Sequence, residues 1–377
     1  MKRLPKLIYC VFPINFFISH RLPIAREAIK KGYEVHLIST KGEGEEILTK
    51  EGIFFHPVQI TRSRKNPIQE IKSIYQIYKI YKKINPDIVH HVTIKPVLYG
   101  TLAARMAGVK AVVNAFSGLG YVFTAKGVKA AILRNVIKLA YRAILRHNNL
   151  ISIIQNEDDR DYLISKTIIR KNQARLIKGS GVDLSIFKPT VEPSGIPVVI
   201  LPARLLKDKG VIEFVEAAKQ LKRLNFKVRM VLVGDVDMGN PSSVSVGEIK
   251  EWVDDGYVEH WGFKNNMAKT LSEANIVCLP SYREGMPKSL IEATASSRVI
   301  ITTDVPGCRE MIDKNNPNGI LIPAGSSIAL SDAIIDILSD KKKRQIMAFN
   351  GRKMAEKEFS INQVVKSTLK IYEDLLN

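Results

Sequence analysis

The chain has 377 residues, of which 45% are hydrophobic and 25% charged, a composition typical of soluble globular proteins and not of disordered ones. A chain of this length is too long to fold around one ordinary hydrophobic core, so we predict two domains. No apolar run is long enough to span a bilayer, and the basic start is followed by no small-residue cleavage site, so we expect a first β-strand there. Three scattered cysteines without metal-ligand spacing indicate reduced packing residues in a cytoplasmic protein.

The positive charge is concentrated in one half of the chain. The formal net charge is +20, and residues 1–190 hold 32 lysines and arginines against 13 acids, whereas residues 191–377 hold 25 against 24. This excess predicts an anionic partner for the first half: nucleic acid, a phosphate-bearing substrate or an anionic membrane. The alternative, a basic composition without a function, does not explain the neutral second half.

The first half begins with alternating strands and helices. Residues 7–12 predict a strand, residues 22–31 a helix and residues 33–39 a second strand. This order is a βαβ start, although the glycine-rich dinucleotide fingerprint is missing. We expect residues 13–20 to form the loop at the end of the first strand.

A helix is predicted over residues 62–83, followed by a strand over 88–92. The helix carries Tyr75, Tyr78 and Tyr81 beside lysines. Such stripes occur at membrane interfaces. They are more often the half-buried face of a helix that covers a sheet, and we favour that interpretation.

Two strand ends in the first half are candidates for ligand contact. Lys95 lies in the loop expected after the strand 88–92, where it is a candidate to touch a phosphate or acceptor; the alternative is a solvated loop residue. A strand over 111–116 is followed by the turn Ser117–Gly120. Glycines at a strand end let a ligand approach the backbone.

A long basic helix is predicted over residues 126–147. Arg134, Lys138, Arg142 and Arg146 recur every four residues and form one stripe opposite an apolar side. We interpret this basic amphipathic helix as a membrane-surface element, each cation near anionic lipid contributing about 1 kcal/mol. The alternative is an ordinary sheet-covering helix with a solvated face.

The second half restarts the α/β pattern. Residues 188–197 contain three prolines and predict the linker between domains. A strand over 198–201 precedes a loop and a helix over 211–222, and a strand over 228–233 ends at Gly234. The sequence Asp235–Asp237 matches a metal-binding Asp-x-Asp pattern. We interpret it as a strand-end turn, because two cations, Arg204 and Lys209, can supply the positive charge that a metal ion would provide.

Residues 277–298 combine a buried strand, a Glu-Gly-x-Pro loop and a helix whose N-terminus faces the carboxyl end of a sheet. Free N–H groups and the positive end of a helix dipole attract phosphate, and open α/β sheets bind ligands at this edge. Glu284 lies in the loop, where a carboxylate can accept hydrogen bonds from sugar hydroxyls. Glu292 lies inside the helix. Two glutamates with this spacing would by themselves indicate only solvated surface residues. The strand, loop and helix around them indicate a binding site instead.

Residues 281–292 resemble the Glu-x7-Glu signature of retaining GT-B glycosyltransferases, glycosyltransferase family four in particular. The resemblance implies that Glu284 contacts the donor sugar and Glu292 the nucleotide ribose. It implies further donor contacts along the loop and the first helical turn, at Gly285, Met286, Pro287, Lys288, Ser289 and Leu290.

Residues 203–210 resemble the Arg-x4-Lys-Gly motif of the same family, which implies that Arg204 and Lys209 hold the donor diphosphate. The chemistry agrees, because breaking a sugar–diphosphate bond builds negative charge that fixed cations stabilise. Two solvated surface cations are the alternative. Phe263, in a loop after a short strand, is a weaker candidate for contact with the base.

The first half shares features with the bacterial branch of the family that builds lipid-linked saccharides. Residues 117–120 resemble its Ser-Gly-Leu-Gly turn, and residues 13–21 occupy the place of its donor- and acceptor-facing loop. The alternative for His20 is a structural histidine whose ring nitrogens form hydrogen bonds within the protein. The residues implied on the acceptor or phosphate side are His20, Arg21, Lys95, Ser117 and Gly118.

The resemblance implies an α/β GT-B fold: two Rossmann-like domains facing across a cleft, with an acceptor domain over 1–190, a nucleotide-sugar domain over 191–360 and a helix over 361–377 that crosses back to the first domain. We expect a retaining transfer of an N-acetylhexosamine or hexose from a UDP-sugar to a polyprenyl-diphosphate-linked saccharide, at an anionic membrane on the cytoplasmic face. No cofactor, metal or nucleic acid is expected, and the oligomeric state is left open.

Two other functions stay possible at this stage. A UDP-sugar epimerase of the same fold would turn over its nucleotide sugar without an acceptor. A nucleic-acid-binding protein would bind DNA or RNA in a salt-dependent way. We rank it last, because the sequence has no aromatic-rich nucleic-acid motif.

Overall fold

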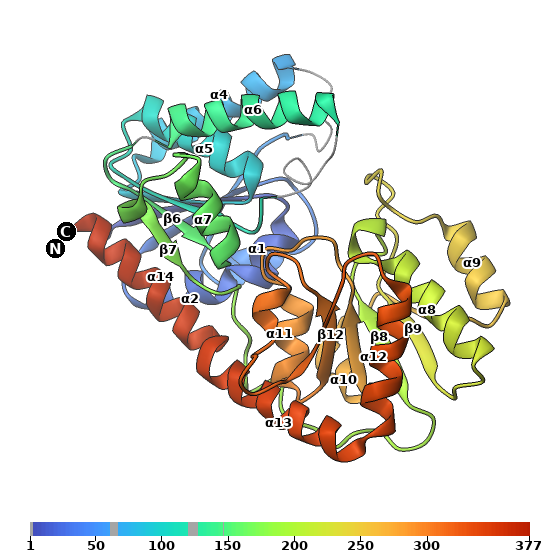
Figure 1. Cartoon of the computed structure of the whole chain (residues 1–377). Helices are drawn as coiled ribbons and strands as arrows, with labels where there is room; N and C mark the ends of the chain where they lie inside the picture. The colour runs from blue at the N-terminus through green and yellow to red at the C-terminus, as the bar shows by residue number, and fades with distance from the viewer. Residues whose placement is uncertain (1–2, 61–66, 120–126, 146) are drawn as a thin grey trace. The chain divides into compact units, whose positions relative to one another are not determined.

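The computed structural model describes residues 3–60, 67–119, 127–145 and 147–377. The chain divides into two compact units, Met1–Ser180 with Asn362–Asn377, and Gly181–Ile361. Each unit is built on a parallel sheet with helices on both faces (Figure 1). Residue 190, the expected boundary, lies inside the second unit, and the last helix belongs to the first unit. Among the described residues, no helix is both long and apolar enough to cross a membrane.

The first unit has a seven-stranded sheet in the order β3-β2-β1-β4-β5-β6-β7. The order reverses between β1 and β4, as at the switch point of a Rossmann-like sheet. The strands are β1 (Lys6–Val11), β2 (Glu34–Ser39), β3 (Phe54–Pro57), β4 (Ile88–Val92), β5 (Ala111–Phe116), β6 (Leu150–Ile154) and β7 (Ala174–Leu176). The helices are α1 (Ile14–His20), α2 (Leu22–Lys30), α3 (Glu45–Lys50), α4 (Pro67–Ile84), α5 (Ile94–Ala107), α6 (Val128–Ile144), α7 (Glu157–Ser165) and α14 (Ile361–Leu376).

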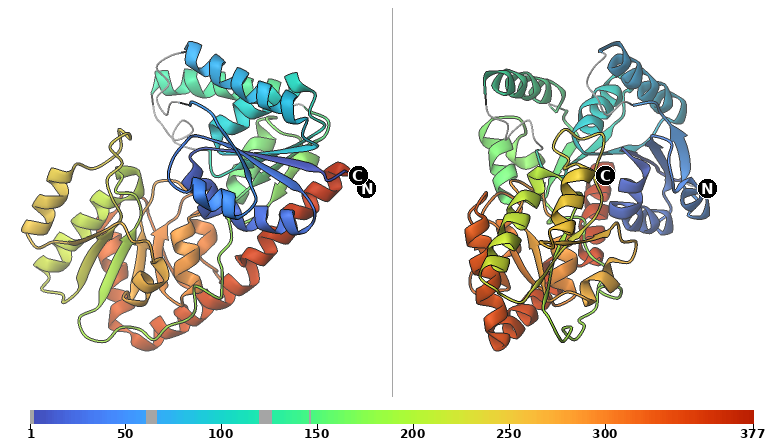
Figure 2. Two further views of the ribbon diagram at one scale, coloured as in Figure 1. Left: turned by 180° about the vertical axis from the view of Figure 1, so that it is seen from behind. Right: turned by 90° about the vertical axis from the view of Figure 1, so that its right-hand side faces the viewer.

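The two faces of this sheet have separate cores, because successive side chains of a strand point to opposite faces. Leu7 and Tyr9 of β1 pack with apolar residues of α2 and α14. Ile8 and Cys10 of the same strand pack with residues of α4, α5 and α6. Figure 2 shows these two helical layers from two further directions. The continuous apolar runs predicted as strands are therefore buried on both sides.

Two expected loops of the first unit are helical. Residues 14–20 form α1, because Pro13 at the N-cap tolerates the loss of its N–H and Phe17 is buried in the core. Lys95 lies in the first turn of α5, where Pro96 fits for the same reason. Both expectations of a loop were wrong, since the prolines begin helices here.

The long helices differ from their predicted extents. α4 begins at Pro67, and residues 62–66 of the prediction lie outside the described residues, as do Gly120, Lys126 and Arg146. Along α4 the tyrosines change from exposed at Tyr75 to fully buried at Tyr81. The stripe therefore belongs partly to the core and partly to the surface.

The second unit has a six-stranded sheet in the order β10-β9-β8-β11-β12-β13, with the reversal between β8 and β11. The strands are β8 (Val198–Pro202), β9 (Arg229–Val233), β10 (Glu259–Gly262), β11 (Ile276–Leu279), β12 (Val299–Thr303) and β13 (Gly319–Ile322). The helices are α8 (Val211–Arg223), α9 (Val246–Asp254), α10 (Met267–Ser272), α11 (Lys288–Ala295), α12 (Ser327–Ser339) and α13 (Lys341–Glu358).

A buried arginine fixes the proline-rich stretch to this unit. Arg298 is 1% exposed, and its guanidinium donates to the carbonyl oxygens of Thr190 at 2.9 Å and Leu271 at 2.8 Å. It also reaches the carbonyl oxygens of Val191 and Ser297. Five N–H donors in one planar group satisfy such a set of acceptors. The expected linker is therefore anchored to the second unit at Thr190 and Val191.

Candidate functional site

The loops that follow β8, β9, β11 and β12 meet at the carboxyl edge of the second unit's sheet, the edge where open α/β sheets bind ligands. The β8 loop is joined to the β11 loop by hydrogen bonds from Tyr282 N, at 3.0 Å, and Ser281 Oγ, at 2.9 Å, to the carbonyl oxygen of Asp208. Glu284 N donates to the carbonyl oxygen of Pro306, at 3.2 Å, in the β12 loop. Three loops predicted separately from the sequence thus form one surface.

Two glycines make this close approach possible. Gly210 has φ +76°, and a Cβ there would lie 2.2 Å from the carbonyl oxygen of Pro280. Gly307 has φ +79°, and a Cβ there would lie 2.5 Å from the carbonyl oxygens of Glu284 and Gly285. Other residues would meet both a strained conformation and a collision with backbone. Gly307 therefore lets the Glu284 loop lie against the β12 loop.

Glu284 and Lys209 form an ion pair at the centre of these loops. Ser281 Oγ also lies within hydrogen-bond distance of Glu284 Oε1, at 2.8 Å. The carboxylate side chain is only 11% exposed and that of Lys209 22%. Charge-assisted hydrogen bonds of this kind fix both groups in place. The structure thus brings together two residues that the sequence places 75 positions apart.

Arg204 is the second cation of the site. Its Nη1 lies 2.7 Å from Oδ2 of Asp237, in the turn after β9. The other aspartate of that turn, Asp235, lies 4.0 Å from Nε2 of His260. The two aspartates therefore contact different partners. No sequence pattern predicts a function for Asp237, and its contact with Arg204 is visible only in the structure.

The helix α11 places the second glutamate. Pro287 is the N-cap, and the first N–H groups of any helix lack partners within it. Glu292 lies one turn further in, is 7% exposed, and has its pKa raised by burial, an effect that Lys288 Nζ, 3.4 Å away, opposes. A buried carboxylate with one nearby cation is suited to accept hydrogen bonds from hydroxyl groups.

The other predicted donor residues differ in what they present. The side chains of Met286 and Leu290 are buried in the apolar core of the second unit. Gly285 and Pro287 are buried, and Lys288 and Ser289 are partly exposed. Phe263 follows β10 at the same sheet edge and is 68% exposed. Their contacts with the donor stay predictions.

In the first unit, the predicted acceptor residues follow the carboxyl ends of three neighbouring strands. His20 and Arg21 follow β1, Lys95 follows β4, and Ser117 and Gly118 follow β5. Lys95 forms an ion pair with Glu70 at 2.8 Å. The Ser117 hydroxyl is buried and has no hydrogen-bond partner among the described residues. These positions share one edge of the sheet.

His20 and Arg21 have mainly structural contacts. His20 Nδ1 lies 2.7 Å from Ser19 Oγ, and its ring stacks on Phe16. Arg21 is 4% exposed, donates to the carbonyl oxygen of His20 at 3.0 Å, and has its pKa lowered by burial beside the Tyr9 and Tyr372 hydroxyls. Arg21 therefore lies within the unit rather than on its surface.

The two histidines of β4 are also core residues. His91 Nδ1 lies 2.7 Å from Asn114 Oδ1 and its Nε2 3.0 Å from Tyr81 OH. Burial lowers the pKa of His91 to about 4, so this ring is neutral near pH 7. His90 Nδ1 lies 2.6 Å from Tyr372 OH, and burial lowers its pKa as well.

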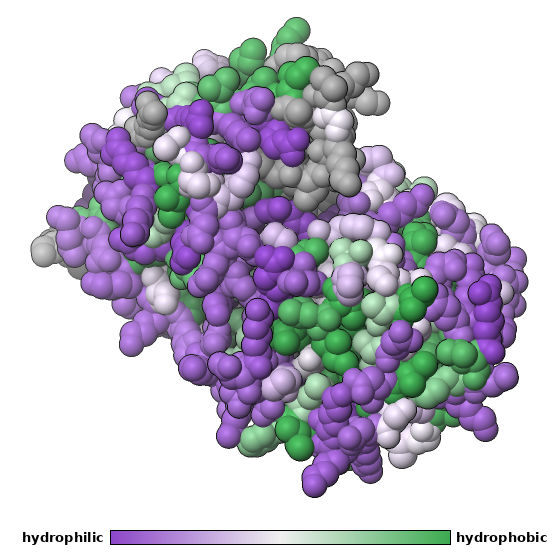
Figure 3. Space-filling view, viewed as in Figure 1, coloured by the Kyte–Doolittle hydropathy of each residue, from purple (hydrophilic) through white to green (hydrophobic). Residues whose placement is uncertain are grey.

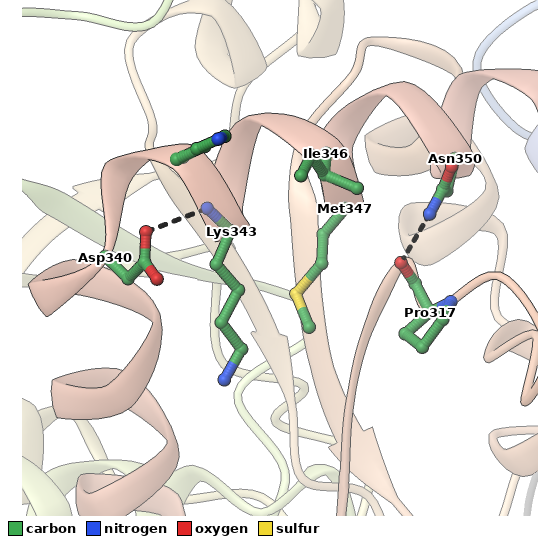
Figure 4. Close-up of a pocket in the computed structure, with 7 residues that line it drawn as sticks. Pro317, Asp340, Lys343, Ile346, Met347 and Asn350 are labelled. Atoms are coloured by element: carbon green, nitrogen blue, oxygen red, sulfur yellow. Dashed lines mark hydrogen bonds between the residues drawn. The ribbon is translucent and has the colours of Figure 1, made fainter.

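A separate hollow of about 410 Å³ lies at the amino end of β13, away from the converging loops (Figure 4). Its polar groups are held by one another: Asp340 Oδ1 caps α13 through Lys343 N at 2.9 Å, and Asn350 Nδ2 donates to the carbonyl oxygen of Pro317 at 3.0 Å. Ile346 and Met347 line the rest. We assign it no chemistry.

Comparison with known proteins identifies the family. Residues 6–153 match the family described as "Glycosyl transferase 4-like", and residues 183–354 match "Glycosyl transferases group 1". This chain is a glycosyltransferase. The two matched segments correspond to the two Rossmann-like units, and the predicted GT-B fold and family are confirmed.

Two relatives of this glycosyltransferase are named for undecaprenol-diphosphate-linked substrates. It is 29% identical, over 96% of this chain and 98% of the relative, to the N,N'-diacetylbacillosaminyl-diphospho-undecaprenol alpha-1,3-N-acetylgalactosaminyltransferase of Campylobacter jejuni. It is 26% identical, over 82% and 81%, to the UDP-Gal:alpha-D-GlcNAc-diphosphoundecaprenol alpha-1,3-galactosyltransferase of Escherichia coli. Among solved structures, HepE of Anabaena in complex with UDP and glucose superposes with a TM-score of 0.79 at 16% identity, over 98% and 100% of the chains.

Proposed function

We propose that this glycosyltransferase transfers a sugar, an N-acetylhexosamine or hexose, from a UDP-sugar to a lipid-diphosphate-linked saccharide in bacterial glycan or polysaccharide assembly. The observation that carries the proposal is the cluster of Arg204, Lys209 and Glu284 at one sheet edge, in a chain whose relatives act on undecaprenyl-diphosphate-linked saccharides. The UDP complex of a structural neighbour supports a uridine nucleotide.

The donor would be held by charges and dipoles already in place. Arg204, Lys209 and the N-terminus of α11 face the developing charge of the diphosphate, and preorganised groups of this kind lower the barrier of a transfer. Glu284 accepts hydrogen bonds from sugar hydroxyls, and Glu292 from the ribose. Lys209 holds the Glu284 carboxylate in place through their ion pair and contributes its other N–H groups to phosphate.

The transfer retains the configuration at the anomeric carbon, as the family resemblance implies, and needs no metal ion. The bond between the anomeric carbon and the diphosphate oxygen breaks, and the acceptor hydroxyl attacks. The departing diphosphate takes the proton of that hydroxyl, which removes the need for a separate base. Arg204 and Lys209 stabilise the diphosphate during this step.

The membrane face of the enzyme is formed by α4 and α6. On α4 the exposed Ile68, Ile71 and Tyr75 recur at helical spacing, and α6 has a similar exposed row of Ile132, Val136 and Leu139. Figure 3 shows hydrophobic side chains gathered over these helices.

Exposed Lys72 and Lys79 lie along α4, and partly exposed Arg134 and Lys138 lie along α6. Residues 88–156, which include α6, contain no acid. Apolar side chains with a basic surround match an anionic bilayer surface. They support a peripheral position on the inner face of the cytoplasmic membrane, where the acceptor lipid lies.

The test is product formation. Purified enzyme is incubated with a panel of UDP-sugars, with and without a polyprenyl-diphosphate saccharide, and products are identified by mass. A new saccharide one sugar longer is expected only with acceptor. Conversion of the UDP-sugar to an isomer without acceptor would instead identify an epimerase. Salt-dependent binding of DNA or RNA without turnover of any UDP-sugar would contradict both enzymes.

A further inference from the structure

The turn between β9 and α9 is attached along its length to the loop that carries Arg204. Leu205 N donates to the carbonyl oxygen of Asp235 at 3.0 Å, and Lys207 N to that of Ser242 at 2.7 Å. Val244 N in turn donates to the carbonyl oxygen of Leu205 at 3.0 Å. Backbone hydrogen bonds in both directions give the two loops a fixed register. A side chain on the turn therefore has a fixed place relative to Arg204.

Asp237 is the residue of this turn that contacts the cation. Its own N–H donates to Ser243 Oγ at 2.9 Å, and its carboxylate is 15% exposed. The Arg204 side chain is 60% exposed and is held through one nitrogen, Nη1, at 2.7 Å from Asp237 Oδ2. The carboxylate is thus the anchored member of the pair, and the arginine is the member that would otherwise move in solvent.

We propose that Asp237 is a positioning residue, which holds the Arg204 guanidinium at the sheet edge so that its remaining N–H groups are directed to the donor diphosphate. The inference rests on the proposed function, in which Arg204 binds that diphosphate. A guanidinium has five N–H donors, so one bond to Asp237 leaves a fork for a phosphate. Because an arginine loses much rotamer freedom when it binds a ligand, holding it in advance lowers the cost of binding.

The opposite effect, competition between Asp237 and the phosphate for Arg204, is the weaker of the two. Asp237 engages only Nη1 of Arg204, so a phosphate can be bound by other N–H groups of the guanidinium without displacing the aspartate. A diphosphate has more charge and more acceptor oxygens than one carboxylate. The net result of losing the aspartate charge is therefore weaker binding of the diphosphate.

The experiment measures the affinity for UDP and for uridine, which lacks the diphosphate, in a double-mutant cycle of Arg204→Ala and Asp237→Asn. Asp237→Asn is expected to weaken UDP binding about fivefold, within the range of coupled neighbours, and to leave uridine binding unchanged. In the Arg204→Ala background, Asp237→Asn is expected to have no further effect. Asp235→Asn, in the same turn but in contact with His260, is the matched control and should bind UDP as wild type does.

The measurements distinguish a failure of the positioning role of Asp237 from a failure of the proposed diphosphate site. If Arg204→Ala weakens UDP binding but Asp237→Asn does not, or tightens it, the positioning role is wrong and the proposed function stands. If Asp237→Asn weakens UDP binding equally with and without Arg204, the aspartate acts on the loop and not through the arginine, which also overturns the inference. If Arg204→Ala binds UDP as wild type does, the diphosphate site itself is wrong.

Discussion

The two units share a Rossmann-like architecture but place their charged residues differently. At the carboxyl edge of the second unit, two cations face two carboxylates, Lys209 with Glu284 and Arg204 with Asp237. In the first unit, the polar residues of β4, His90 and His91, are neutral and buried. The net charge therefore does not locate the donor site: the proposed site lies in the nearly neutral half, whereas the excess of lysines and arginines lies in the other half.

The largest expected effect is on the ion pair of the second unit. Lys209→Ala and Glu284→Ala should each lower turnover about 10²- to 10³-fold, because each removes a preorganised group of the kind that stabilises a transition state. The measurement is product mass with a UDP-sugar and a polyprenyl-diphosphate saccharide. Lys207→Ala, an exposed lysine of the same loop, is the control and should stay near wild type. Wild-type turnover by both folded variants would leave the second unit without a donor site.

A smaller loss is expected when the loop is displaced without removing any charge. In Gly307→Ala, the new Cβ must push the Glu284 loop away, and misplacing a reacting group by about 1 Å can cost about 10²-fold in rate. We expect kcat/KM to fall by up to that factor. Gly195→Ala is the matched control, since Gly195 also has a positive φ, +92°, but a Cβ there would meet nothing within 4 Å. Equal activities of the two variants would show that the close contact does not position Glu284.

For the first unit, the test is binding to vesicles. Wild-type enzyme should float with anionic liposomes at moderate salt and be released at high salt. Ile71→Glu and Leu139→Glu should each weaken binding about tenfold, because burial of such a side chain is worth about 1.5–3 kcal/mol.

Leu224→Glu changes a residue of the second unit that is just as exposed, 63% against 67% for Ile71 and 62% for Leu139, and should float as wild type does. No retention of the wild type on anionic vesicles would remove the membrane half of the proposal.

The smallest expected effect is on acid stability, and it concerns His91. Its folded-state pKa of about 4 lies below the ordinary value of 6.5, so between these pH values the unfolded chain binds a proton that the folded protein does not. Stability is therefore lost as the pH falls through this window, by about 2 kcal/mol for this group at pH 5.

Thermal unfolding at pH 7 and pH 5 measures the loss. His91→Gln should show a smaller decrease in melting temperature than wild type. An identical decrease in both proteins would contradict the assignment to His91.

Much of the fold follows from the sequence. Residues 88–92 and 111–116 form the strands that their apolar runs predict, because both faces of each strand are covered. The converging loops were also predictable, since parallel strands end at one edge. The functions assigned to Arg204, Lys209 and Glu284 stay predictions, which the activities of their variants test.

Other features could not be predicted from local patterns. The prolines Pro13 and Pro96 were compatible with a loop or with a helix start, and only the packing of Phe17 and the remainder of α5 decides between them. The contact between Arg204 and Asp237 depends on the register of two loops from different strands, with 33 positions between the residues. No periodicity or spacing encodes that register.

The buried Arg298 has a consequence for anyone who recombines halves of such enzymes. In a chimera joined within the proline-rich stretch, residues 188–197, the carbonyl oxygens that Thr190 and Val191 offer to this guanidinium would come from the backbone of another enzyme. The safer crossover lies upstream, next to Gly181, so that Arg298 and its acceptors are inherited together.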